Sequence, residues 1–121
     1  MIQRDYIDRL IQECAEALRR MLRLRSEGQH DEALQAFGQA VDRILGPIRP
    51  LVERMEPDSA VDFVGPNQLD RLRLYAAVSL SGGALVDDDL ERIGVLTTLV
   101  DIGALGPRYR DELGRLARPQ G

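Results

Sequence analysis

The chain has 121 residues, 44% of them apolar, which suits one compact domain and is too hydrophobic for a disordered chain. Its formal charge is −4, and this disfavours nucleic-acid binding because phosphate contacts draw their affinity from basic residues. The chain has one cysteine, which excludes an intrachain disulfide. Its N-terminus is too charged for a secretion signal. The longest uncharged stretch, residues 74–86, is too short to cross a bilayer. We therefore expect a cytoplasmic protein of one domain, residues 1–121.

The first predicted element is an amphipathic helix from Gln3 to about Arg25. Its apolar residues recur every three or four positions, which is the spacing of one helical face. The stripe consists of Ile7, Leu10, Ile11, Cys14, Ala17, Leu18, Met21 and Leu24. This stripe is broader than the contact face of a helix in a two-stranded coiled coil, so we expect it to face a protein core or a partner protein.

A second helix is predicted from Asp31 to Leu45, after a turn in which Gly28 suits a left-handed cap position. The connection is short, so the two helices should lie antiparallel and adjacent. Ala33, Phe37 and Ala40 follow Gly28 at the spacings of the second helix of a tetratricopeptide repeat, where small residues permit close helix packing. Residues 1–45 therefore resemble one tetratricopeptide-like hairpin.

The repeat pattern is incomplete elsewhere. Arg20 and Met21 stand where a Leu-Gly pair would be expected, and a shift of about 34 residues finds no second copy. We therefore expect a single hairpin and no superhelical array.

The opening also resembles that of a family of uncharacterised bacterial proteins. The likeness rests on "IQRDYIDRLI" and "EGQHDEAL", which match an IQRDYI-x-RLI helix followed by an EG-x-x-x-EAL hairpin, and it covers roughly the first 45 residues. The resemblance implies an all-α fold and supplies no catalytic residues.

The remaining chain is also predicted to be helical. Residues 46–66 are proline-rich, with short helical pieces opened by Pro50 and Pro57 and the second piece ended by Gly65. Residues 67–118 are expected to hold further helices. The first spans about 66–81 and carries an apolar side of Leu69, Leu72, Tyr75, Ala76 and Leu80. A largely buried helix follows over about 88–103, and a last one begins at Pro107, with Tyr109, Leu113 and Leu116 aligned. The predicted fold is an all-α array of about five or six helices.

No residue pattern indicates catalysis, a metal or a cofactor. His30, the only histidine, has no second ligand at metal-site spacing and is interpreted as a turn or capping residue. Cys14 lies on the apolar stripe, as a buried structural thiol would. Residues 87–89, three consecutive aspartates, could bind a hard cation, although helix capping explains them better. "LSGGAL" lacks the lysine and preceding strand of a phosphate loop.

We expect a non-enzymatic interaction or scaffold protein that self-associates, as a homodimer, through apolar helix faces. The residues predicted to form these faces are Ile7, Leu10, Ile11, Leu18, Met21, Leu96, Leu99 and Val100. The alternative is a small-ligand or sensor domain whose pocket lies between helices, near Arg73, Tyr75 or residues 87–89. A third hypothesis, nucleic-acid contact through Arg19, Arg20 and Arg23, competes with their interpretation as a solvated helix face.

Overall fold

The computed structural model describes residues 2–81 and 90–112, and every regular element in these ranges is a helix. In chain order the α-helices are α1 (Ile2–Ser26), α2 (His30–Leu45), α3 (Arg49–Arg54), α4 (Pro57–Val64), α5 (Leu69–Ser81), α6 (Leu90–Val100) and α7 (Pro107–Glu112). Short 3-10 turns, η1 (Gly46–Ile48), η2 (Pro66–Gln68) and η5 (Ile102–Leu105), join some of them. The predicted all-α fold is confirmed.

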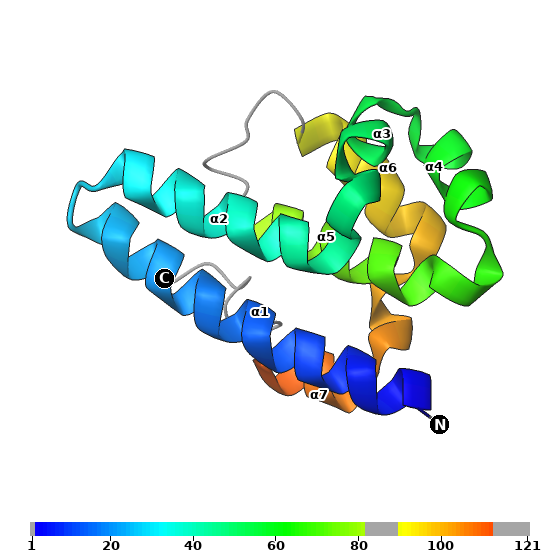
Figure 1. Cartoon of the computed structure of the whole chain (residues 1–121), viewed down its shortest axis with the longest axis horizontal. Coiled ribbons are helices and arrows are strands. Elements are labelled where there is room, and N and C mark those ends of the chain that lie inside the picture. The colour runs from blue at the N-terminus through cyan, green and yellow to red at the C-terminus, as the bar shows by residue number, and fades with distance from the viewer. Residues whose placement is uncertain (1, 82–89, 113–121) are drawn as a thin grey trace.

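The N-terminal hairpin is present as predicted. Helices α1 and α2 pack side by side along their length, and Figure 1 shows the turn between them at one end of the molecule. Gly28 adopts φ 78° in that turn, a conformation that costs glycine little because it has no Cβ. The backbone N–H of Gln29 then donates to the carbonyl of Leu24 at 2.9 Å, which closes the end of α1.

Proline and glycine divide the following segment. Pro50 and Pro57 stand in the first turns of α3 and α4, where a missing N–H removes no helical hydrogen bond. Gly65 ends α4 with φ 73°. These boundaries agree with the predicted ones.

Helix α5 is the centre of the core. It packs against α1, α2, α4 and α6, and its residues from Leu74 to Ser79 are all buried. The sequence predicted a single apolar side that included Leu80, but Leu80 is exposed. The difference arises because neighbours surround the middle of α5, so small and aliphatic residues on every side are covered.

Helix α6 differs from its prediction in two ways. It ends at Val100, three residues before the expected Gly103, because Asp101 adopts the left-handed conformation with φ 56°. It is also covered on one side only: Ile93, Leu96 and Val100 face the core, whereas Val95 and Leu99 are half-exposed. The expectation of a largely buried helix is wrong for that outer side.

Helix α5 contacts both the α1–α2 hairpin and the helices α4 and α6. Figure 1 shows α3, α4 and α6 gathered at the end of the molecule opposite the α1–α2 turn. Helix α7 lies against α1 on the side away from α2 (Figure 1). The predicted positions Leu113 and Leu116 lie outside the described residues.

Arginine side chains connect separate elements. Arg73 of α5 donates from Nε to the carbonyl of Val100 at 2.6 Å, at the end of α6. Arg92 of α6 donates to the carbonyls of Val52 and Met55, at the end of α3. A cation at a helix C-terminus satisfies unpaired carbonyls and complements the helix dipole. These contacts therefore fix how the short helices sit on the core.

Candidate functional site

Seven of the eight residues predicted to form interaction faces lie inside the chain itself. They are Ile7, Leu10, Ile11, Leu18, Met21, Leu96 and Val100, each almost fully buried in the common core. Leu99 alone is accessible, with 50% of its surface exposed. The broad stripe of α1 is therefore internal packing, because α2, α5 and α7 all lie against that helix. It presents no free apolar face.

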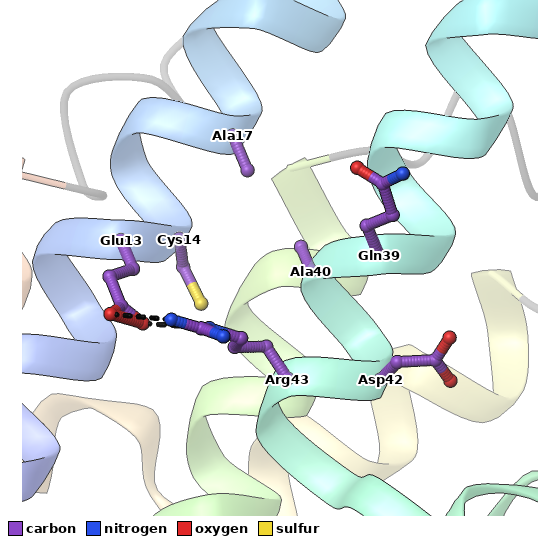
Figure 2. A pocket seen from close by; sticks show the side chains of 7 residues that line it. All are labelled: Glu13, Cys14, Ala17, Gln39, Ala40, Asp42 and Arg43. Carbon is purple, nitrogen blue, oxygen red and sulfur yellow. Dashed lines mark hydrogen bonds and ion pairs between the residues drawn. The ribbon is translucent and has the colours of Figure 1, made fainter.

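A groove of about 510 Å³ runs between α1 and α2 (Figure 2). Its lining residues are Glu13, Cys14, Ala17, Gln39, Ala40, Asp42 and Arg43. Small side chains occupy the positions where the two helices face each other, so the space between the ridges is not filled. Ala40, one of the small residues in the tetratricopeptide-like pattern, thus borders a hollow on the surface as well as a close helix contact.

The groove is crossed by an ion pair. Arg43 of α2 donates from Nε and Nη2 to the two carboxylate oxygens of Glu13 on α1, both at 2.9 Å (Figure 2). This hydrogen-bonded guanidinium lowers the pKa of Glu13, and the carboxylate in turn raises the pKa of Arg43. Such a two-bonded pair holds both side chains in a fixed orientation across the groove.

Cys14 lies on the floor of the groove with 1% of its surface exposed. Burial raises the pKa of its thiol to about 12, and the nearby Glu13 carboxylate adds to the effect. The thiolate is the reactive form of cysteine, so this side chain is chemically inert at neutral pH. The prediction of a buried thiol is confirmed.

Two smaller hollows continue the groove along α1. The first, about 320 Å³, is lined by Tyr6, Arg9, Leu10, Glu13 and Arg43, so it shares the ion pair with the larger groove. The second, about 140 Å³, is lined by Tyr6, Ile7, residues 67 and 68 of η2, and residues 70 and 71 at the start of α5. Tyr6 lines both hollows, so they adjoin at its side chain.

Sequence reasoning missed this site. Tyr6, Arg9 and Glu13 stand at i, i+3 and i+7 on α1, so their spacing already placed them on one flank of the helix. Nothing in the sequence paired that flank with Arg43 and Arg71, which come from other helices.

The pocket residues that the sequence suggested do not line these hollows. Tyr75 is buried and its hydroxyl accepts a hydrogen bond from Arg92 at 3.2 Å. Arg73 bonds Asp70 and the end of α6. Residues 82–89, which contain both glycines of "LSGGAL" and the three aspartates, lie outside the described residues.

The other singled-out polar residues are on the surface. His30 is the first residue of α2 and is exposed. Arg19, Arg20 and Arg23 are exposed on the outer side of α1. In the described ranges, no group of three or more histidine, cysteine, aspartate or glutamate side chains is arranged to hold a metal ion.

The outer side of α6 has a different character from the groove. Between Ile93 and Val100 no residue is charged, although Val95, Thr98 and Leu99 are exposed. The hydroxyls of Thr97 and Thr98 both donate to the carbonyl of Gly94, at 2.8 and 3.2 Å, so their polarity is satisfied within the helix. The result is an uncharged face about two turns long.

Comparisons with family models, with curated proteins and with solved structures find no match for this chain. Within the part of the chain that the structure describes, no helix combines the length and apolar character needed to span a bilayer.

Proposed function

We propose that this chain is a non-enzymatic interaction domain that pairs with a second copy of itself through the outer face of α6. We define this face as Gly94, Val95, Thr98 and Leu99. The observation that carries the proposal is the combination of half-exposed apolar side chains with a complete lack of charge from residue 93 to residue 100. The centres of protein interfaces are depleted in charged residues in the same way.

A second copy suits this face better than a charged partner. The whole chain carries −4, so two copies repel each other wherever their acidic surfaces meet. Two uncharged faces can approach without that repulsion. A twofold axis would bring each patch against its own equivalent, which is the commonest symmetry of homo-oligomers.

The shape of α6 permits close approach. Apart from its chain neighbours and the backbone of its own helix, a Cβ added at Gly94 would meet no atom of the described residues within 4 Å, so α6 is open on that side. Small residues let two helices approach closely, and Val95 and Leu99 stand one turn apart beside Gly94 and Thr98. Helices α3 and α4, which gather at the same end of the molecule as α6 (Figure 1), also carry half-exposed apolar side chains, Leu51 and Phe63.

Sedimentation velocity over a range of concentrations tests the proposal. The unmodified chain should form a dimer, and Leu99→Arg should make it a monomer because it places two cations at the centre of the interface. Leu34→Arg is the matched control, since Leu34 is similarly exposed but lies on α2. A monomer at every concentration, or equal disruption by the control, would contradict the proposal.

A further inference from the structure

The two hollows on either side of Tyr6 have an excess of positive charge, although the protein as a whole is acidic. Arg9 and Arg43 line the larger hollow and Arg71 lines the smaller one. They come from α1, α2 and α5, so the tertiary fold brings them together. Arginine recognises phosphate and carboxylate groups through its planar set of N–H donors.

Two of these charges have no carboxylate partner among the described residues. Arg43 is paired with Glu13. Arg71 contacts Tyr6: its Nη2 donates to the hydroxyl at 3.2 Å and its guanidinium lies 5.5 Å from the ring centroid. Arg9 forms no ion pair with any carboxylate in the described ranges, although its charge helps to lower the pKa of Glu13. The nearby Asp70 is bonded to Arg73 at 2.8 Å. Counted over the residues that the structure describes, the two hollows together therefore carry about two positive charges without a paired carboxylate.

The neighbouring groove between α1 and α2 could hold the uncharged, organic part of a ligand. It adjoins the hollow at the Glu13–Arg43 pair, and its floor consists of Cys14, Ala17 and Ala40. Small-molecule sites combine such apolar walls with a few polar groups that fix orientation. One end of the site thus attracts a dianion, and the other accommodates a compact apolar group.

We propose that this site binds a small phosphate monoester. Arg9 and Arg71 hold the phosphate beside the hydroxyl of Tyr6, Arg43 contributes its outer N–H groups, and the organic part lies over Cys14, Ala17 and Ala40. The site is independent of α6, so this proposal does not rest on self-association. A long polyanion such as nucleic acid fits less well, because the rest of this acidic chain repels it.

The test is an NMR titration of the full chain with phenyl phosphate and with inorganic phosphate, at constant ionic strength and with chloride as the reference. Saturable shifts are expected in the amide signals of residues 6–13 and in the side-chain N–H signals of the site's arginines. Phenyl phosphate should bind more tightly than inorganic phosphate because only the ester fills the groove. Equal affinities would overturn the role given to the groove, and no saturable shift with either probe would overturn the whole proposal.

Charge variants give the second arm. Arg9→Gln and Arg71→Gln should each weaken phenyl phosphate binding about tenfold, which corresponds to one charge-assisted hydrogen bond of about 1.4 kcal/mol. Glu13→Gln should strengthen binding, since it removes the carboxylate that competes for Arg43.

The matched controls are Arg54→Gln and Glu32→Gln, which make the same charge changes at exposed positions on α3 and α2. Effects in the controls as large as those in the site variants would show non-specific attraction and overturn the site. Saturable binding of a hexaglutamate peptide without binding of either phosphate would overturn the phosphate assignment in favour of an acidic peptide.

Discussion

Arg92 offers the sharpest test of how this fold is held together. Its Nε donates to the carbonyl of Met55 at 3.1 Å, Nη2 to that of Val52 at 2.5 Å, and Nη1 to the hydroxyl of Tyr75 at 3.2 Å. Helix α3 has only six residues and cannot be stable alone, so this cross-link positions it. We predict that Arg92→Met greatly destabilises the protein.

The expected loss is worked from the three bonds. A hydrogen bond to a charged group contributes about 1.5–3 kcal/mol, but neighbouring bonds from one side chain are not additive and this one is only partly buried. We therefore expect Arg92→Met to cost about 3 kcal/mol, a large share of the ~5–15 kcal/mol that stabilises a typical domain. Arg92→Lys should cost about 2 kcal/mol, because a single ammonium group cannot reach all three acceptors that surround the planar guanidinium group.

Urea unfolding followed by far-UV circular dichroism measures these changes directly. The control is Arg54→Met. Arg54 is exposed at the end of α3, so its substitution should change stability by less than about 0.5 kcal/mol. A loss of under about 1 kcal/mol for Arg92→Met, or a loss matched by the control, would show that the cross-link is not what holds α3 in place.

The remaining predictions concern the core, one backbone position and the buried thiol. Leu72→Ala should cost about 2–5 kcal/mol because Leu72 is fully buried, whereas Leu51→Ala should change stability little; urea unfolding compares them. Asp101→Gly should raise the melting temperature, since glycine adopts φ 56° without strain and the change removes a negative charge from a helix C-terminus; a lower value would contradict this. The folded pKa of Cys14, about 12, lies above its ordinary 9.0, so ionisation of the unfolded thiol should reduce stability as the pH rises above 9, by about 1.4 kcal/mol at pH 10. This loss of stability between pH 9 and pH 10, measured by urea unfolding, should be absent in Cys14→Ala.

Local signals in the sequence predicted most of the fold. The apolar spacing in α1, the glycine at position 28 and the prolines at 50 and 57 act through backbone geometry or through one helical face, so they can be interpreted without knowing what lies nearby. The boundaries of α2, α3 and α4 followed from them. The end of α6 did not, because a single aspartate rather than a glycine adopts the left-handed conformation there.

The candidate sites depended on tertiary structure to a much greater degree. The sequence alone determined that the chain is helical, that α1 carries a broad apolar stripe and that residues 93–100 of α6 carry no charge. Only the fold decided that the stripe of α1 is buried by three neighbours while one side of α6 is left open. It also brought Arg9, Arg43 and Arg71 around Tyr6 from three separate helices. The physical reason is that helical periodicity specifies which residues share a face, whereas the helix that covers a face is chosen by long-range packing.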